Sequence, residues 1–470
     1  MAAVVAWRVG VPSPWRDEGA TWLAAGRPLP DLVALARTVD LVHLPYYLVA
    51  HAVLAIDDSV IALRWFSVVV TALTGGVLVA LGRRLGSLPV GVTAGLALAA
   101  SPLASRYGQE ARPAALAALA ASLAALALVR ATEPDARRRA WAAYLLAVVA
   151  TGLVNVLALL VVAGHAVCVA GARRAALRRW AGASAAALAV RAPFLVATSR
   201  QAGQVGWLTR PTWHDLAVVL RSPFGADLGA VAVLAFVAVG VLGMRRPAFA
   251  LGAGWGLLPP VLLWLVSQWH PLFDGRYAVA ALPGICLALA SLASLASLTS
   301  LPPTSSLRDH ARRTVPGVTV VAALALVGWP AQLGYRDPAS GHTEDVRGVL
   351  AILTTRSRPG DAVLFVPDHL RIVTQMAPGL GRPTNGLPDD VALGRDRIAS
   401  ATLTGTDVPP GDLTERMVGR DRVWLVTGPA GTATAVTPAD ARKVALLAHE
   451  FTEVRREQVP HFTVTLYQRR

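Results

Sequence analysis

Long apolar segments separated by short polar connections recur along most of the chain. An α-helix needs about 20 mainly apolar residues to cross a bilayer. The pattern therefore predicts an α-helical membrane protein with spans at residues 59–82, 88–103, 113–130, 140–153, 155–171, 181–197, 227–243, 248–267, 276–297 and 315–331. The first ten residues are too short to span alone. We interpret them as the outer end of a first helix, which gives about 11 transmembrane helices.

Arginine clusters fall in every second connection between these spans. Cytoplasmic loops of membrane proteins carry an excess of Lys and Arg, so these connections are assigned to the cytoplasm. They contain Arg83 and Arg84, Arg137 to Arg139, Arg173, Arg174, Arg178 and Arg179, Arg245 and Arg246, and Arg308, Arg312 and Arg313. The opposite set is expected outside the cytoplasm: residues 11–58, 104–112, the turn near 154, 198–226, 268–275 and everything after 332.

The apolar stretch at residues 44–56 is an exception within this scheme. At 13 residues it is too short to span, and counting it as a span would reverse the charge assignment of the next loops. Its length suits an interfacial helix, and Tyr46 and Tyr47 are residues expected at the headgroup boundary. We therefore expect a long outer loop with two surface helices, at 20–37 and 44–56.

The chain changes character after about residue 338. Strand-like runs at 361–367, 422–428 and 461–468 alternate with helical patterns. This predicts a small α/β domain outside the membrane. We therefore expect two domains, a transmembrane domain at 1–335 and an extracytoplasmic α/β domain at 336–470.

Composition agrees with a membrane protein. Of the 470 residues, 54% are hydrophobic and 16% charged, whereas a soluble domain has about a quarter charged. The net charge of +15 comes almost wholly from Arg, with Lys443 the single lysine. The basic residues form short clusters between apolar spans, which is typical of topology signals and not of nucleic-acid binding. The excess of Arg and Ala is typical of a high-GC bacterial genome, so we expect the cytoplasmic (inner) membrane of a bacterium.

Neither cysteine predicts chemistry. Cys168 and Cys286 lie inside apolar spans and are interpreted as small core residues. The sequence has no Cys and His cluster with the spacing of a zinc site, so we expect neither a metal nor another cofactor. A divalent ion beside the outer carboxylates is left open.

The outer loops hold the conspicuous polar side chains, beginning with the pair Asp17 and Glu18. A carboxylate near the membrane boundary can accept a proton from an attacking hydroxyl. Guanidinium groups can bind a phosphate through two parallel hydrogen bonds and stabilise it as it leaves. A lipid-linked donor would deliver its phosphate at this depth. The combination suggests glycosyl transfer from a polyprenyl phosphate-linked sugar.

Five stretches in order resemble the glycosyltransferase C superfamily, in its protein O-mannosyltransferase and aminoarabinose transferase branch. They are WRDEGATWLAAGR, DLVHLPYYLVAHAVLAI, ALRWFSVVVTALTGGVLVALGRRLG, SPLASRYGQEARPAALAAL and DGRYAVAALPG, which together cover about residues 1–300. The resemblance implies a multi-spanning fold with juxtamembrane helices in the first outer loop. It also implies inverting transfer from a polyprenyl phosphate donor.

The resemblance implies roles for residues on this chain. Asp17 is the expected general base, with Glu18 beside it. The expected ligands of the donor phosphate are Arg112 and Arg276, together with Arg106 and Arg191, an arginine placed within a span. The residues expected to contact the sugar or the acceptor are Asp40, His43, Tyr46, Gln109, Glu110 and Tyr277. The acceptor is expected to be a cell-envelope glycan, glycolipid or protein.

Structural roles are the alternative for most of these residues. Asp17 and Glu18 could simply cap a helix starting near Ala20 and complement its dipole. Asp40 could be a turn residue and His43 an interfacial histidine. Glu110 could pair with Arg112 on a solvated loop, and Arg106 and Arg276 could extend to the interface. Arg191 could reach the surface or pair with a neighbour.

Two other classes of function are compatible with an arginine-rich membrane protein. A transporter or flippase for lipid-linked glycans would also use intramembrane arginines, but it should show broken helices in two related halves. A non-catalytic scaffold would merely present the C-terminal domain, and its outer acids would be dispensable.

Overall fold

The computed structural model describes residues 1–170, 174–201, 203, 206, 208–225, 246–296, 307–429 and 437–470. The chain divides into two compact units. The helical unit comprises Met1–Trp7 and Trp65–Leu333, and the α/β unit comprises Arg8–Arg64 and Gly334–Arg470. The expected two-domain division differs in one respect, because the first outer loop groups with the C-terminal residues and not with the spans.

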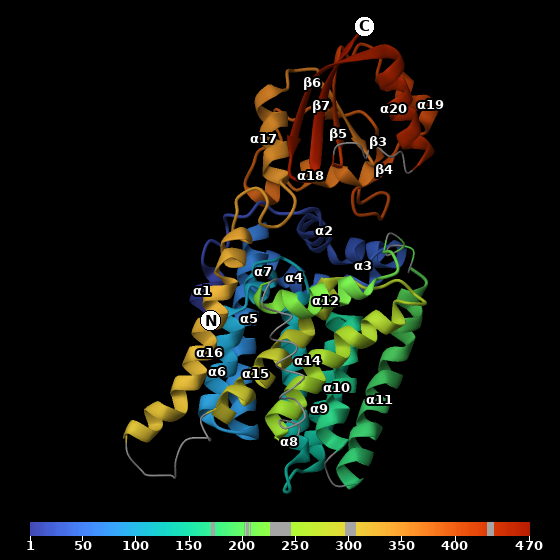
Figure 1. Ribbon diagram of the computed structural model, residues 1–470. Helices are drawn as coiled ribbons and strands as arrows, with labels where there is room; N and C mark the ends of the chain where they lie inside the picture. Colours follow the sequence, from blue (N-terminus) through green and yellow to red (C-terminus); the bar gives the residue numbers. More distant parts are fainter. Residues whose placement is uncertain are drawn as a thin grey trace. The chain divides into compact units, whose positions relative to one another are not determined.

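Six helical segments within the described residues are long and apolar enough to cross a membrane. They are α5 (Val60–Leu85), α8 (Ala114–Thr132), α11 (Arg174–Ser199), α14 (Pro247–Val266), the pair η5 (Gly275–Ala281) with α15 (Leu282–Ala296), and α16 (Leu307–Gly334). In Figure 1 the long helices of this unit run side by side. The prediction of a multi-pass α-helical membrane protein is confirmed. The expected span at 227–243 lies outside the described residues.

The expected span at 88–103 is not one straight helix. It consists of α6 (Leu88–Ala100) and α7 (Pro102–Gly108), which meet at an angle of 68°. Pro102 cannot donate the backbone hydrogen bond that would continue α6. Ser101 instead begins α7, and its hydroxyl accepts a hydrogen bond from the backbone nitrogen of Ala104 (3.3 Å). The chain therefore bends before the polar residues that follow Gly108.

The other helices of this unit are shorter. They are α1 (Ala2–Ala6), α9 (Arg138–Val154), η2 (Val156–Leu160), α10 (Val161–Ala170), α12 (Trp213–Arg221) and η4 (Ser222–Phe224). The expected span at 155–171 is divided between η2 and α10. Asn155 lies at this break, where its side chain accepts a hydrogen bond from the backbone nitrogen of Leu157 (2.9 Å).

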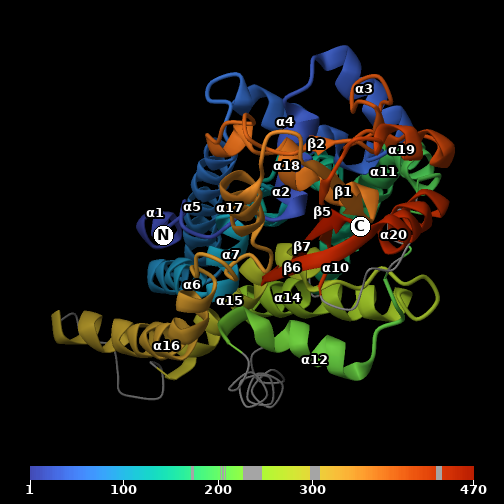
Figure 2. The same ribbon diagram turned by 90° about the horizontal axis from the view of Figure 1, so that it is seen from above.

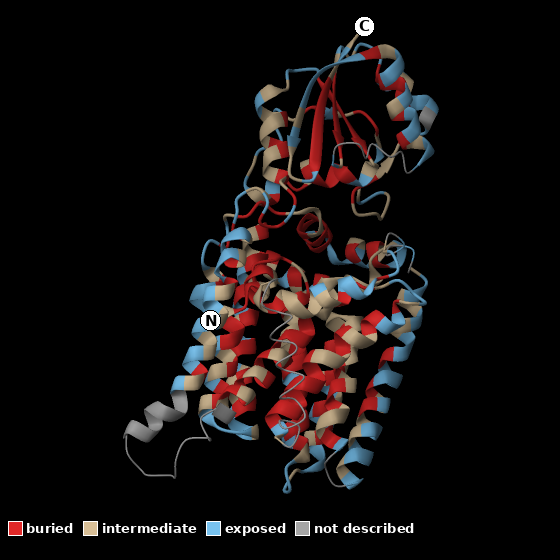
Figure 3. Cartoon of the chain, viewed as in Figure 1, coloured by how far each residue is buried: buried red, intermediate tan, exposed pale blue. Residues whose placement is uncertain are grey.

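Small residues set the packing inside the helical unit. A Cβ on Gly252 of α14 would lie 2.6 Å from the backbone nitrogen of Ala288, and one on Gly284 would lie 2.8 Å from the backbone nitrogen of Gly256. These glycines let α14 and α15 approach closely, as is common between membrane helices. Figure 3 shows α8 and α14 largely buried, while α11 and α16 expose most of their surface.

The α/β unit begins with the helices of the first outer loop: α2 (Arg16–Ala25), α3 (Leu29–Thr38), η1 (Leu41–His43) and α4 (Leu44–Leu54). The second expected surface helix, at 44–56, is confirmed as α4. The first, expected as one helix over 20–37, is wrong in its extent. Pro28 and Pro30 interrupt it, because proline fits the start of a new helix but not the interior of an old one.

The C-terminal part forms a five-stranded sheet with strand order β2-β1-β5-β7-β6. The strands are β1 (Ala362–Val366), β2 (Asp389–Asp390), β5 (Arg422–Thr427), β6 (Phe451–Val459) and β7 (Phe462–Arg469). β1 pairs in parallel with β2 and β5, and β7 pairs antiparallel with β5 and β6. A separate pair joins β3 (Leu393–Arg395) to β4 (Thr406–Asp407).

Helices cover both faces of this sheet. In Figures 1 and 2, α17 (Val346–Arg356) lies on one side, with α19 (Pro410–Arg416) and α20 (Pro438–Glu450) on the other. The short helices η6 (Asp368–Arg371), α18 (Ile372–Gln375) and η7 (Pro378–Leu380) follow β1. β1 is buried along its whole length, as expected for a strand covered on both faces. The predicted α/β fold is confirmed.

The single lysine of the chain belongs to a buried ion cluster in this unit. Lys443 Nζ donates to the Phe365 carbonyl (2.9 Å) and to Asp440 Oδ1 (3.3 Å), and it pairs with Asp407. Arg371 pairs with the same Asp407. A compact ammonium with three donors suits three acceptors converging on one point, which a planar guanidinium does not.

Replacing Lys443 with Met should lower the free energy of unfolding of this unit by about 2–3 kcal/mol, because Asp440 loses its buried cation while Arg371 still neutralises Asp407. Thermal unfolding of the detergent-solubilised protein checks this. An unchanged melting temperature would contradict the proposed importance of the cluster.

Candidate functional site

The acid pair lies in the first turn of α2. The helix begins at Arg16, four residues earlier than expected, after Trp15 in an extended conformation. Carboxylates in a first turn are favoured by the helix dipole. The Glu18 carboxylate also accepts a hydrogen bond from the backbone nitrogen of Trp15 (3.4 Å). The capping role considered as an alternative is therefore observed for Glu18, in a helix that begins at Arg16.

Glu18 is completely buried and tightly bound. Its two carboxylate oxygens accept hydrogen bonds from Nε (2.8 Å) and Nη2 (2.6 Å) of Arg64, and Oε2 lies 3.3 Å from His342 Nδ1. Burial alone raises the pKa of Glu18, but the charge and hydrogen bonds of Arg64 and His342 outweigh it and hold the pKa well below its usual value. Glu18 is thus an ionised, fixed side chain.

Arg64 joins three separate parts of the α/β unit. Besides Glu18, it donates from Nη1 to the carbonyls of Val9 (3.0 Å) and Pro12 (2.9 Å), and its Nη2 lies 3.1 Å from His342 Nδ1. Neither Arg64 nor His342 is among the site residues predicted from the sequence. For Arg64 a signal was present, since a single arginine interrupts an otherwise apolar run at the start of α5.

Asp17 differs from its neighbour. It is only partly buried, and its backbone carbonyl accepts a hydrogen bond from the Thr21 hydroxyl (3.2 Å) within α2. The residue before it, Arg16, binds Glu344 through its backbone nitrogen (2.9 Å) and through Nε (2.8 Å). Of the two acids, Asp17 is the one placed toward the surface of the unit.

The rest of α2 packs on the helices that follow β1. Gly19 has no room for a side chain, because a Cβ there would lie 2.8 Å from Met376 Sδ. The ring of Trp22 lies against Gly379, and its Nε1 donates to Asp58 (2.9 Å).

The C-terminal end of α2 is held by arginines. Arg397 Nη1 donates to the Leu23 carbonyl (2.8 Å), and Arg27 donates to the carbonyls of Leu23 and Thr402. The bonds to Leu23 satisfy a carbonyl group that the helix end leaves open, and the bond to Thr402 ties this end to a distant loop. Burial first, and then the charge of Arg397, lower the pKa of Arg27 to about 10. Both ends of α2 are therefore fixed by residues of the α/β unit.

Asp40, His43 and Tyr46 lie together at the start of α4. Asp40 has a left-handed backbone (φ 61°), and its carboxylate accepts a hydrogen bond from the Tyr47 hydroxyl (2.8 Å). The His43 ring lies 5.8 Å from the Tyr47 ring, and Tyr46 is buried. The turn role considered for Asp40 is observed. Contact of these residues with a sugar stays a prediction.

Gln109 and Glu110 follow α7 in the helical unit and are both buried. The side-chain nitrogen of Gln109 donates to the carbonyls of Val5 and Trp7, so it anchors the N-terminal segment. Glu110 lies 3.5 Å from Arg106, and its backbone carbonyl accepts a hydrogen bond from Ser67.

The structural alternatives considered for this loop differ from the structure in two respects. Glu110 is not on a solvated loop, and Arg106 is itself buried, so it does not extend to the interface. Arg112 is partly buried in the turn before α8.

Arg191 and Arg276 also belong to the helical unit. Arg191 is buried, donates to the Gly152 carbonyl (2.9 Å) and lies over the Phe194 ring. Of its two structural alternatives, pairing with a neighbour is observed and reaching the surface is not. Arg276 is the second residue of η5, lies 3.5 Å from Asp274 and 5.3 Å from the centre of the Tyr277 ring, and is partly exposed.

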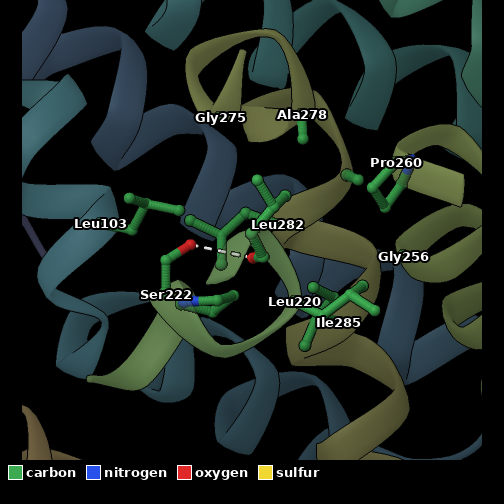
Figure 4. Close-up of a pocket in the computed structure, with 12 residues that line it drawn as sticks. Leu103, Leu220, Ser222, Gly256, Pro260, Gly275, Ala278, Leu282 and Ile285 are labelled. Carbon is green, nitrogen blue, oxygen red and sulfur yellow. Dashed lines mark hydrogen bonds between the residues drawn. The ribbon is translucent and has the colours of Figure 1, made fainter. Parts of the chain in front are cut away.

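Two pockets adjoin η5, the segment that carries Arg276. The first has apolar walls from α12, α14 and α15, with Gly275 and Ala278 of η5 at its edge. Figure 4 shows its leucine, isoleucine and proline side chains, and its one hydroxyl, from Ser222, is bonded to a backbone carbonyl. The second pocket lies between η5 and α7 and includes Tyr107.

The predicted site residues thus fall into two sets. Asp17, Glu18, Asp40, His43 and Tyr46 belong to the α/β unit. The helical unit contains Arg106, Gln109, Glu110, Arg112, Arg191, Arg276 and Tyr277. Among the described residues, no group of three or more His, Cys, Asp or Glu side chains is placed to hold a metal ion.

Comparison with known proteins assigns the fold. Residues 44–196 match the family model described as dolichyl-phosphate-mannose-protein mannosyltransferase. The crystal structure of ArnT from Cupriavidus metallidurans bound to undecaprenyl phosphate matches with a TM-score of 0.50 and 14% identity, covering 86% of this chain and 84% of ArnT. The chain has the fold of the glycosyltransferase C superfamily. The fold and the family match together indicate a membrane glycosyltransferase.

Two further structures resemble this glycosyltransferase. ArnT in the apo state gives a TM-score of 0.49 with 16% identity, covering 86% of this chain and 87% of ArnT. The Archaeoglobus fulgidus oligosaccharyltransferase gives a TM-score of 0.36 with 14% identity, covering 78% of this chain and 56% of that protein. No curated protein sequence matches the chain.

Proposed function

We propose that this glycosyltransferase moves a sugar from a polyprenyl phosphate donor to an acceptor hydroxyl outside the bacterial cytoplasmic membrane. Asp17 takes the proton of the hydroxyl as its oxygen attacks the anomeric carbon. The bond from that carbon to the phosphate oxygen breaks on the opposite face, so the configuration inverts. Arg112 and Arg276 stabilise the polyprenyl phosphate that leaves. The sugar is mannose- or arabinose-like, and the acceptor is a glycan, glycolipid or protein of the cell envelope.

The contrast between the two acids carries the proposal. Glu18 is buried and occupied by Arg64 and His342, so it cannot shuttle protons to a substrate. Asp17 lies next to it on the same helix turn, partly exposed. A general base must be accessible to the substrate hydroxyl and held in a fixed position. Asp17 is partly exposed, and contacts to Glu344 and Arg397 hold the two ends of its helix.

The surroundings of Arg276 support a lipid-linked donor. Arg276 lies at the end of a membrane-spanning segment, where its guanidinium can bind a phosphate held at the membrane boundary. ArnT, which shares the fold, was crystallised with undecaprenyl phosphate. These observations favour a polyprenyl phosphate over a nucleotide-linked sugar.

Replacing Arg276 with Gln should raise the KM for the donor about 30- to 150-fold, since a charge-assisted phosphate contact contributes about 2–3 kcal/mol. Initial rates at varied donor concentration measure this. The matched control is Arg246→Gln, which removes a guanidinium of the same unit that contacts Ser294. Equal effects of the two substitutions would contradict a specific phosphate contact.

A donor panel tests the function itself. The purified protein in liposomes is incubated with polyprenyl phosphate-linked pentoses and hexoses and with extracts of envelope acceptors. We expect transfer from one donor class, with release of polyprenyl phosphate and an inverted anomeric centre by NMR. Movement of the intact donor across the bilayer without transfer would support the transporter alternative. Binding of an acceptor without either event would support a scaffold.

A further inference from the structure

Residues 342–344 contact both neighbours of Asp17 in sequence. Glu344 accepts hydrogen bonds from the backbone nitrogen and the guanidinium of Arg16, and its side chain is 5% exposed. His342, which is completely buried, contacts the Glu18 carboxylate. The two contacts hold the residues immediately before and after Asp17. They come from one tripeptide that lies more than 300 positions later in the chain.

The backbone of this tripeptide adopts a rare conformation. Thr343 has φ of 74°, in the left-handed region that β-branched residues seldom occupy. Its backbone nitrogen donates to the Ser340 carbonyl (2.9 Å), and its hydroxyl donates to the His342 carbonyl. The turn places the side chains of His342 and Glu344 so that each reaches α2. Strained backbone of this kind persists where surrounding contacts enforce it and is concentrated at functional sites.

The residues just before α2 are also bonded to the region around residues 342–344. The backbone nitrogen of Ser13 donates to the Pro338 carbonyl (2.8 Å), and the Ser13 hydroxyl accepts from the backbone nitrogen of Arg347 (3.0 Å). Arg347 also donates to the carbonyls of Val11 and Gly10 (both 3.0 Å). The segment before α2 is thus fixed by the same region, and α2 has little freedom to rotate or shift.

We propose that His342, Thr343 and Glu344 form a positioning clamp that holds Asp17 in its catalytic orientation. This inference rests on the proposed function, because it assigns the clamp to the residue named there as general base. The role of residues 342–344 would then be to position the general base. A misplaced base reduces the rate of the chemical step more than it weakens substrate binding.

The test compares five variants by kcat and donor KM, each normalised to folded enzyme from size-exclusion chromatography. Glu344→Gln removes the charge that holds Arg16, and we expect kcat to fall about 10- to 100-fold while the donor KM changes less than about twofold. Thr343→Pro should lower kcat by at least the same factor, because proline requires a negative φ and lacks the N–H that donates to the Ser340 carbonyl. Thr343→Gly should keep kcat within about twofold, since glycine accepts the left-handed conformation.

The matched control is Glu453→Gln, which breaks an exposed ion pair with Arg456 in the same unit and should leave kcat unchanged. Hydrogen–deuterium exchange gives a readout independent of turnover: amides at the start of α2 should exchange faster in Glu344→Gln than in the control. If Glu344→Gln kept the wild-type kcat while Asp17→Asn was inactive, the clamp proposal would be wrong and the proposed function would still hold. Full activity of Asp17→Asn would overturn both.

Discussion

Asp17→Asn should abolish most turnover while the protein inserts and folds normally. Asn has the same shape as Asp but cannot take a proton from the acceptor hydroxyl. Removal of a general base typically lowers the rate by about 10²- to 10⁴-fold, and we expect a loss of at least about 10³-fold in kcat. Because Asp17 is partly exposed, the melting temperature should change little. Single-turnover transfer from a radiolabelled donor measures the chemical step directly.

Glu18→Gln is the informative comparison for this prediction. It alters the neighbouring acid by the same isosteric change, but at a buried position bonded to Arg64. We expect it to lower the melting temperature clearly and to reduce kcat of the remaining folded enzyme less than Asp17→Asn does. If Asp17→Asn kept more than about a tenth of the wild-type kcat, the base would have to be sought elsewhere.

The spans and the C-terminal sheet could be predicted because local patterns determine them. Apolar runs of sufficient length give α5, α8, α11 and α14, and strand-like runs give the core strands of the sheet. The bend at Ser101 and the break before α3 follow from proline, which is also visible in the sequence. Both were missed because an apolar pattern extends across Pro102 and a helical pattern across Pro28.

The grouping of the first outer loop with the C-terminal part could not be predicted in the same way. It depends on contacts such as Arg16 with Glu344 and Glu18 with His342, which join residues more than 300 positions apart. No periodicity or charge count reports such pairings. Similarly, Gln109 is a polar loop residue in sequence, and only the structure shows its amide bonded to the carbonyls of Val5 and Trp7. The type of a residue shows which side chains could belong to the site. Only the tertiary contacts show which of them are buried in structural roles and which are accessible to a substrate.

Replacing Arg64 with Met should be the most destabilising single change in the α/β unit. It leaves the Glu18 carboxylate buried without its guanidinium partner and also removes hydrogen bonds to Val9 and Pro12. Breaking a buried ion pair from one side costs about 3–5 kcal/mol. Tryptophan fluorescence during thermal unfolding should show a lower melting temperature. The exposed-pair variant Arg456→Met should cost less than about 1 kcal/mol.

The loss of stability in Arg64→Met should depend on pH, and its direction follows from the pKa of Glu18. In the wild-type protein the folded pKa of Glu18 is lowered, so its stabilising contribution is present above the unfolded pKa of about 4.3 and is lost as the pH falls through the folded value. Without Arg64, burial raises the pKa of Glu18, and ionisation opposes folding as the pH rises. The difference in stability between wild type and Arg64→Met should therefore be larger at pH 8 than at pH 5.

Adding Glu18→Gln to Arg64→Met should recover part of the lost stability, since no buried charge then remains at position 18. A gap in stability that is constant with pH would show that Arg64 acts through its backbone contacts and not through Glu18.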